Sequence, residues 1–388
     1  MQDALYLEEG KLVVYKRDQT FYARIRLAPR RYIWRSLRTS DAALARRAGL
    51  KLFYNLEFKQ EQGLPIASRS VKAVIDDYVA MREKSFRQGR TSSGMLRQIR
   101  RVVRFWREYI GNRSIESVGD KEIKGYLEWR RDYYTRQKQL PKNARLVPTD
   151  KTLQWEIMLG KAIIKWATER GLRGNKPAPT FSFTPKTKRV RPAFELHEYR
   201  ILWRTMLQRI REAKNERWKK SRELLRDYVL ILSNSGIRVG EANNLKIRDV
   251  TSFTDDKARR NYRFIVKGKT GERDAILRAS AATHVDRLLQ HRKGANANDW
   301  LFAMPDGSRI ITLIDQFDDV LRQGGITHNS HGQRYTLYSL RHFYAVMALR
   351  KGIGVFEVAR NMGTSVQMIQ SYYGKQATSA TFATRLGD

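Results

Sequence analysis

Residues 337–343 read Leu-Tyr-Ser-Leu-Arg-His-Phe, inside a stretch whose apolar residues recur with the period of a helix. Three apolar side chains predict the buried stripe of that helix: Leu340, Phe343 and Met347. Arg341 and His342 should therefore turn toward a different face. The helix would present a cation and an imidazole side by side, and the rest of the C-terminal half supplies possible partners for them.

A second arginine follows a glycine turn earlier in the chain. Residues 234–236 read Asn-Ser-Gly, and Arg238 comes shortly after them at the start of a new helix. Backbone donors at such a start can face the same pocket as the guanidinium group. Glu241, one helical turn later, could orient Arg238. Taken alone the pattern is weak, because surface arginines after glycines are common.

A glycine-rich hairpin comes next. Tyr262–Val266 and Asp274–Leu277 alternate as strands around Lys-Gly-Lys-Thr-Gly-Glu-Arg at residues 267–273. Lys269 would lie at the tip, where it could reach a phosphate or a leaving group. By itself this segment favours an ordinary solvated lysine.

The last motif lies near the C-terminus. A short helix predicted over 355–362 is closed by Gly-Thr-Ser at 363–365, and a segment with two adjacent tyrosines follows. Helical phase does not choose between Tyr372 and Tyr373. Two arginines, a lysine and a tyrosine suit phosphoryl transfer, because guanidinium groups bind phosphate, a lysine donates a proton and a tyrosine hydroxyl attacks.

The charge of the chain indicates a polyanionic partner. Among 388 residues, 76 lysines and arginines against 39 acidic residues give a net charge of +37. Such a surplus repels itself unless a polyanion is bound, and nucleic acid is the leading candidate. An anionic membrane surface is the rival, but the sequence has no strongly apolar amphipathic segment and no apolar run of about 18 residues.

The residue types argue against several other classes. There are no cysteines, and the six histidines show no paired-ligand spacing, so we expect no metal and no cofactor. Adjacent aspartates at 76–77, 255–256 and 318–319 point in divergent directions, which makes a metal nuclease the least favoured class. The first residues lack the pattern of a signal peptide, and we expect a cytoplasmic, nucleoid-associated protein.

Composition divides the chain into four segments. Residues 1–63 predict a small sheet followed by a helix, with β-prone runs at 12–15, 21–27 and 32–37 and a helix from 42 to about 61. The arginines crowding this sheet fit a solvated face and a strand-borne DNA reader equally well. Residues 68–175 predict an all-helical domain, 176–192 a linker, and 193–388 a domain of helices with one β-hairpin.

Two basic stretches lie between the N-terminal segment 1–63 and the C-terminal segment 193–388. The apolar stripe of 95–110 leaves five arginines on the remaining surface: Arg97, Arg100, Arg101, Arg104 and Arg107. No acid interrupts them before Glu108, so we assign DNA phosphate contacts to the first four, with a solvated face as the alternative. The basic run at 186–191 ends the linker, where it is either solvated or follows a DNA backbone.

Together the C-terminal motifs resemble the tyrosine recombinase, or phage integrase, family of site-specific recombinases. The likeness covers most of 194–388 and rests on order and spacing: Gly-Ile-Arg-x-x-Glu-Ala at 236–242, the Gly-Lys hairpin, Ser-Leu-Arg-His at 339–342, Met-Gly-Thr-Ser at 362–365, then tyrosine. The resemblance implies a multidomain, mainly α protein. It would have an arm-type DNA-binding module of sheet plus helix, an all-α core-binding domain, and an α+β catalytic domain of the tyrosine recombinase type.

The resemblance also implies roles. Arg238 and Arg341 look like the arginines that bind the phosphate, and Lys269 like the general acid for the departing 5′ oxygen. Tyr373 lies nine residues after Thr364, at the family's spacing for the nucleophile, so Tyr373 would form the 3′-phosphotyrosyl link. The reaction would use neither metal nor ATP. It would pass through a Holliday junction in a homo-tetramer on double-stranded attachment sites, with accessory DNA-bending or directionality factors as further partners.

Two positions depart from the family's commonest pattern. Tyr338 stands where histidine is usual, and Thr364 where histidine or tryptophan is usual. A tyrosine with a pKa near about 10 is a poor general base at neutral pH. The acceptor of the Tyr373 proton is therefore open among His342, a phosphate oxygen and water, with Tyr338 acting only as a hydrogen-bond donor. Thr364 can still donate one hydrogen bond to the phosphate, and we expect reduced or differently timed chemistry.

The expected function is that of an integrase of a phage or other mobile element. The alternative is a catalytically weak or inactive DNA-binding regulator on the same fold. A type IB topoisomerase shares the chemistry without choosing a site, and the N-terminal segments argue against it. The tail at 377–386 would pack on a neighbouring protomer or on its own core.

Overall fold

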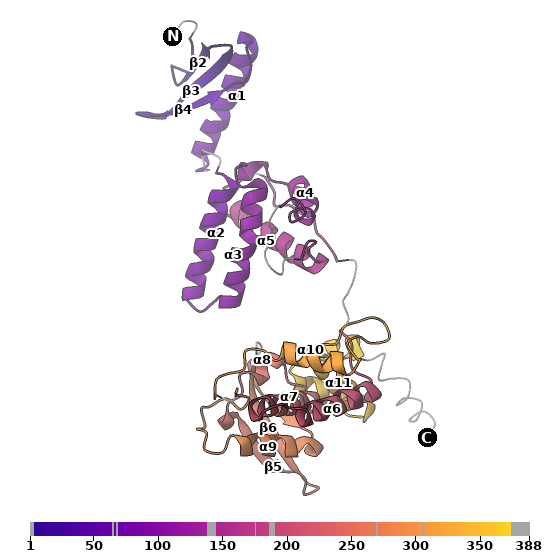
Figure 1. Ribbon diagram of the computed structural model, residues 1–388. Coiled ribbons are helices and arrows are strands. Elements are labelled where there is room, and N and C mark those ends of the chain that lie inside the picture. Colours follow the sequence, from indigo (N-terminus) through magenta and orange to yellow (C-terminus); the bar gives the residue numbers. More distant parts are fainter. Residues whose placement is uncertain are drawn as a thin grey trace, which may run out of the picture. The chain divides into compact units, whose positions relative to one another are not determined.

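A computed structural model describes residues 4–63, 66, 69–137, 145–174, 176–185, 191–268, 271–304 and 306–373 (Figure 1). The chain divides after residue 188 into two units, which are treated separately below. The protein is multidomain and mainly α, which confirms the fold class implied by the sequence. The segment boundaries chosen from composition stay predictions.

The N-terminal unit begins with an antiparallel sheet of four strands in sequential order. Its strands are β1 (Leu5–Leu7), β2 (Leu12–Arg17), β3 (Thr20–Ala28) and β4 (Arg31–Ser36), and α1 (Ala42–Glu61) follows. The Asp41 carboxylate caps α1 by accepting from the Leu44 amide at 2.8 Å. Apolar side chains of β2 and β3 pack against α1, so the sheet has one buried face. The β-prone runs predicted three of these strands, and β1 was missed because three residues carry little periodicity.

Four helices make up the rest of the N-terminal unit: α2 (Val71–Arg87), α3 (Ser93–Ile110), α4 (Asp120–Arg131) and α5 (Asp150–Glu169). Trp106 of α3 stacks on Tyr126 of α4, with ring centroids 4.0 Å apart and planes 6° apart. The apolar stripe predicted for 95–110 is buried as expected.

The arginines of α3 are less free than the sequence indicates. Arg100 binds Glu83 at 2.7 Å and Arg107 binds Asp76 at 2.5 Å, and both acids come from α2. No acid interrupts these arginines in the sequence before Glu108, but acids distant in sequence lie beside two of them. The assignment of DNA phosphate contacts to Arg97, Arg100, Arg101 and Arg104 stays a prediction. Arg97, Arg101 and Arg104 are exposed and take part in no ion pair within the described part of the chain.

The C-terminal unit is built around two buried helices, α7 (Glu216–Ser235) and α11 (Leu337–Arg350), which pack against each other (Figure 1). The other helices are α6 (Leu196–Arg211), α8 (Val239–Ala242), α9 (Ala282–His291), α10 (Ile314–Gln323), α12 (Val355–Met362) and a last one over 366–373. The single buried stripe predicted for α11 was incomplete: Arg341 and His342 are buried as well as Leu340 and Phe343, and Met347 is only half-buried.

A three-stranded antiparallel sheet lies beside these helices, in the order β5 (Val250–Thr254), β6 (Arg260–Gly268) and β7 (Gly271–Leu277). The glycine-rich hairpin was predicted correctly as β6 and β7. β5 was not predicted from the sequence, because its side chains are nearly all exposed and show no apolar alternation.

Candidate active site

The turn between α7 and α8 positions the side chain of Arg341. Gly236 ends α7 with φ of 66°, and a Cβ there would lie 2.4 Å from the ring of Tyr344. Only glycine satisfies both conditions. The Gly236 carbonyl accepts a hydrogen bond of 2.6 Å from Nη1 of Arg341. The tight turn therefore holds the guanidinium of the central helix α11.

Arg238 is held by a carboxylate and by a second backbone carbonyl. Its Nη1 binds Glu241 Oε1 at 2.6 Å, and its Nη2 donates to the Gly363 carbonyl at 2.6 Å, just beyond the end of α12. The Glu241 side chain also accepts from the Arg238 backbone amide at 2.9 Å. The predicted orientation of Arg238 by Glu241 is thus present. Each arginine reaches a carbonyl on a different helix connection, and this ties α8, α11 and α12 together.

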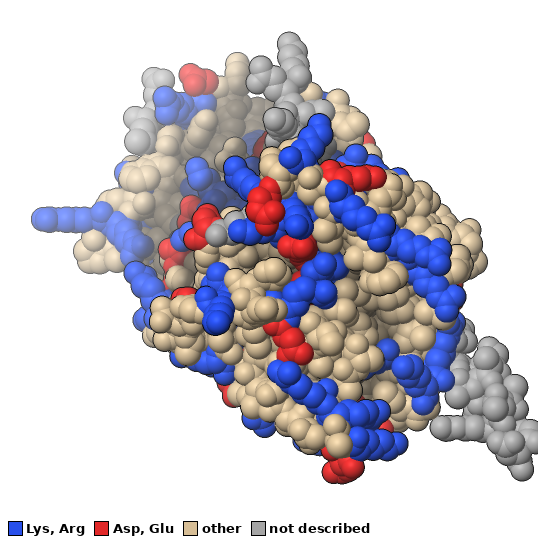
Figure 2. Space-filling view, turned by 60° about the horizontal axis from the view of Figure 1, so that its bottom comes forward, with Lys and Arg blue, Asp and Glu red and all other residues tan. Residues whose placement is uncertain are grey.

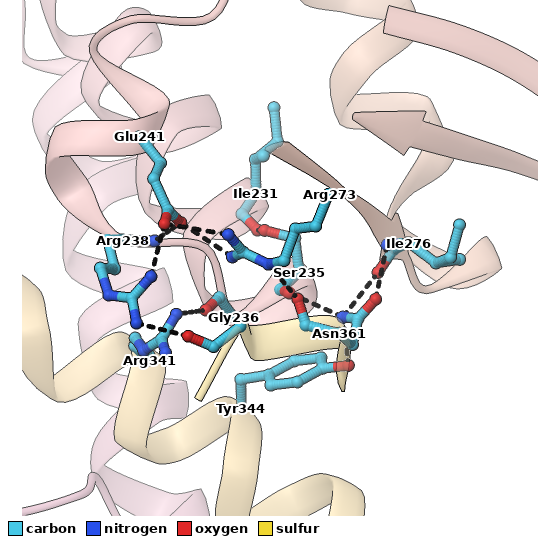
Figure 3. A network of polar contacts seen from close by, with 11 residues as sticks. Ile231, Ser235, Gly236, Arg238, Glu241, Arg273, Ile276, Arg341, Tyr344 and Asn361 are labelled. Carbon is cyan, nitrogen blue, oxygen red and sulfur yellow. Dashed lines mark hydrogen bonds and ion pairs between the residues drawn. The ribbon is translucent and has the colours of Figure 1, made fainter. Parts of the chain in front are cut away.

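Glu241 is held by a third arginine that the sequence analysis missed (Figure 3). Arg273, on β7, places Nη1 and Nη2 at 3.0 and 2.9 Å from the two carboxylate oxygens. Burial alone would raise the pKa of Glu241, but hydrogen bonds from Arg273 and Arg238 outweigh it and hold the pKa at about 2. Glu241 is therefore a permanent carboxylate at neutral pH.

Asn361 links several elements beside the arginines (Figure 3). Its Nδ2 donates to the carbonyls of Ser235 and Ile276 and to the hydroxyl of Tyr344, at 3.0, 3.2 and 2.7 Å. Its Oδ1 accepts from the Ile276 amide at 2.6 Å. One amide side chain thereby connects α7, β7, α11 and α12.

Arg341 lies in a strongly positive environment. Burial, and then the neighbouring charge of Arg238, lower its pKa to about 10, so it remains charged at neutral pH. Among the described residues its side chain donates a hydrogen bond only to Gly236. Most of its five N–H donors are therefore left for another acceptor. Two adjacent guanidinium groups with spare donors form a site for an anion such as a phosphate.

The helix over 366–373 brings Tyr373 against α11. Its hydroxyl is hydrogen-bonded to Nδ1 of His342, and both side chains are buried. Burial, followed by the charges of Arg191 and Arg341, lowers the pKa of His342 to about 4, so the imidazole is neutral at pH 7. Burial raises the pKa of Tyr373, although the charge of Arg341 opposes this. A protonated phenol can thus donate to an unprotonated imidazole nitrogen.

The other predicted site residues differ in their distance from His342 and in their burial. The Tyr338 ring lies 5.0 Å from the His342 ring, whereas Tyr372 is 41% exposed on the outer side of its helix. Thr364 is half-buried directly after Gly363, whose φ of 61° and contact with Arg273 require glycine. Lys269 lies outside the described residues, as does the tail at 377–386. The arginines of α3 belong to the other unit.

The missed residues gave little signal in the sequence. Arg273 lies in the quoted hairpin and Asn361 directly precedes Met-Gly-Thr-Ser, but neither type is unusual at such a place. Across the described part of the chain, no cluster of three acidic or histidine residues could hold a metal ion. In the same residues no helix has the length and hydropathy needed to span a bilayer.

Comparison with known proteins identifies this unit. The sequence profile of the phage integrase family matches residues 202–379. These residues form a phage integrase family domain. Curated proteins compared by sequence give no match.

Solved structures show the same fold over a longer part of the chain. A lambda integrase dimer bound to a COC′ core site aligns with 14% identity over 93% of this chain and 94% of that one, with a TM-score of 0.57. The Tn1549 transposon integrase in complex with circular intermediate DNA aligns with 18% identity over 79% and 95%, with a TM-score of 0.55. At these identities the likeness establishes the tyrosine recombinase fold.

Proposed function

We propose that this protein is a site-specific DNA recombinase, an integrase of a phage or other mobile element, that cuts and rejoins DNA through a 3′-phosphotyrosyl intermediate. The observation that carries the proposal is the meeting of Arg238, Arg341, His342 and Tyr373 in one place. These side chains come from three separate helices, and two of them are buried charges or bases that need a functional explanation.

The proposed reaction follows from the chemistry of these groups. The Tyr373 oxygen bonds to phosphorus, the bond from phosphorus to the 5′ oxygen breaks, and Lys269 gives a proton to that oxygen. Arg238 and Arg341 neutralise the charge that grows on the non-bridging oxygens, a type of contribution worth roughly 3–4 kcal/mol per donor in other enzymes. A 5′ hydroxyl then attacks the phosphotyrosine, releases Tyr373 and completes strand exchange.

His342 is the acceptor that the geometry favours for the Tyr373 proton. It already holds the hydroxyl through Nδ1, whereas Tyr338 has no hydrogen bond to Tyr373 among the contacts of the described residues. A pKa of about 4 makes His342 a weak base in the free protein. An incoming phosphate anion would raise that pKa, because it offsets the charges of the surrounding arginines. The base would thus become stronger only when DNA is bound.

The charge distribution supports double-stranded DNA as the partner. Figure 2 shows Lys and Arg side chains over much of the visible face, with scattered Asp and Glu between them. With a net charge of +37, neutralisation of a polyanion is the main electrostatic gain available to this chain. A homo-tetramer on paired attachment sites, with accessory factors, is part of the proposal.

The decisive experiment is covalent trapping. A duplex selected from a random pool by the Tyr373→Phe protein, then nicked so that the cut fragment diffuses away, should give a denaturant-stable adduct with the wild type. Mass spectrometry of the peptide should place the DNA on Tyr373. Tyr372→Phe is the matched control and should keep the adduct. If the wild type binds this duplex without forming an adduct, the catalytic proposal fails.

A second candidate function is DNA-binding regulation without catalysis. It is favoured by Tyr338, which replaces the histidine usual in the family, and by the raised pKa of Tyr373 in the free protein. The same trapping experiment decides between the two, because a regulator would bind the selected duplex and leave it intact.

A further inference from the structure

The face of Tyr338 is covered by a cation from the preceding segment. The guanidinium carbon of Arg191 lies 4.5 Å from the centroid of the Tyr338 ring. That ring lies 5.0 Å from His342, and His342 is hydrogen-bonded to Tyr373. Arg191, Tyr338, His342 and Tyr373 therefore form a continuous series of contacts that ends at the proposed nucleophile.

Arg191 differs from the other arginines of the site in its freedom. Arg238, Arg273 and Arg341 are each held by a carboxylate or a carbonyl. Arg191 is exposed and has neither an ion pair nor a hydrogen bond among the described residues. Its guanidinium instead lies over the Tyr338 ring. Stacking on a ring positions a planar guanidinium without using its N–H donors, so all five stay available.

We propose that Arg191 is a third phosphate-binding residue, and that it contacts a non-bridging oxygen of the phosphate attacked by Tyr373. This rests on the proposed function. A phenol at position 338 cannot carry a positive charge, whereas the family's usual histidine can. Arg191, stacked on that ring, supplies a positive charge beside it. The basic run at the end of the predicted linker thereby gains a catalytic use for its last residue.

Electrostatics support this placement. The charge of Arg191 already acts on His342, whose pKa it lowers after burial and alongside Arg341. The other groups around His342 are the phenols of Tyr338, Tyr373 and, farther away, Tyr372, with its ring 6.5 Å distant. A phosphate in this space would meet cations from α8, from α11 and from the segment before α6.

Single-turnover cleavage of the selected nicked duplex tests the proposal. Arg191→Ala should cleave about 10- to 100-fold more slowly than the wild type, less than the roughly 10²–10³ of a buried oxyanion donor. Arg211→Ala removes another exposed charge, at the end of α6, and should change the rate less than about twofold. Equal rates for the two variants would overturn the role of Arg191.

A substrate with a methylphosphonate at the cleaved position separates charge neutralisation from a structural role. A methyl group replaces one non-bridging oxygen, so this linkage carries no charge for Arg191 to neutralise. The defect of Arg191→Ala relative to wild type should shrink to less than about threefold on this substrate, well below the defect expected for the charged linkage. A defect of the same size on both substrates would show that Arg191 only supports the fold, and would overturn the proposal.

A measurement without cleavage keeps this proposal separate from the catalytic one. In protein labelled with ¹⁵N-histidine, inorganic phosphate should shift the His342 ring signals, which a His342→Gln spectrum assigns. Arg191→Ala should bind phosphate several-fold more weakly than wild type and Arg211→Ala. If no adduct forms but this difference is found, the proposed function fails and the Arg191 site stands. If the affinities are equal, the Arg191 site fails whether or not an adduct forms.

Discussion

Arg273 donates hydrogen bonds to both carboxylate oxygens of Glu241, with nitrogen–oxygen distances of 3.0 and 2.9 Å. The two residues come from β7 and α8, and the same carboxylate orients Arg238. The position of a phosphate-binding arginine thus depends on a strand of the hairpin. A buried, doubly paired carboxylate of this kind also makes stability depend on pH.

Glu241→Gln should lose a pH-dependent part of the stability. The pKa of Glu241 is held at about 2, below its ordinary value, so its contribution is fully present above that ordinary value and is lost as pH falls toward 2. The contribution at pH 7 is about 3 kcal/mol. Urea unfolding should show a gap between wild type and variant that narrows from pH 7 to pH 3. A gap independent of pH would contradict this.

Asn361→Ala should destabilise the C-terminal unit. The change leaves the Ser235 and Ile276 backbone groups and the Tyr344 hydroxyl without their shared partner. Unpaired buried polar groups cost about 1–3 kcal/mol each, so we expect a loss of at least about 2 kcal/mol in the free energy of unfolding. Asn244→Ala, which removes two exposed hydrogen bonds, one to the Gly240 carbonyl and one from Arg309, is the control and should cost less than about 1 kcal/mol. Equal losses for the two variants would show that the hydrogen bonds of Asn361 do not stabilise the C-terminal unit.

His342 should set the acid limit of DNA cleavage. Protonated His342 has no free Nδ1 to accept the Tyr373 proton, and its pKa of about 4 in the free protein should rise toward the ordinary value with phosphate bound. The single-turnover rate should therefore fall with decreasing pH somewhere between about 4 and 6.5. His342→Gln should be slower by about 10²-fold or more at pH 7 and should lack this acid limb. A variant with an unchanged acid limb would show that another group takes the proton.

The unpaired arginines of α3 should dominate the salt dependence of DNA binding. Replacing Arg97 and Arg101 together by glutamine should reduce the slope of log K against log salt by about 2. Arg100→Gln should change the slope less, because Glu83 already compensates that charge. Filter binding or fluorescence anisotropy at salt concentrations between about 50 and 200 mM measures this slope. Equal slopes for all variants would remove α3 from the DNA interface.

The sequence predicted most elements that depend on local signals. The helix over Ala42–Glu61 follows from an N-cap residue and helix-forming composition, and β6–β7 from alternating residues around glycines. The order of the arginine, lysine and tyrosine motifs was also visible, because the reactive types stand in short patterns with fixed spacing. Each of these signals is contained in a short continuous stretch of the sequence.

Tertiary structure decided which groups meet and how charged they are. The sequence placed Arg100 and Arg107 on a basic surface, and only the folded chain brings acids of α2 into ion pairs with them. It placed Arg341 and His342 on a different face of their helix from the apolar stripe, and packing buries that face as well. Burial and neighbouring charge set the pKa values of Glu241 and His342, and both act through space between residues far apart in the chain. Residue types and their order are local properties of the sequence, but desolvation and charge pairing exist only once the chain has folded.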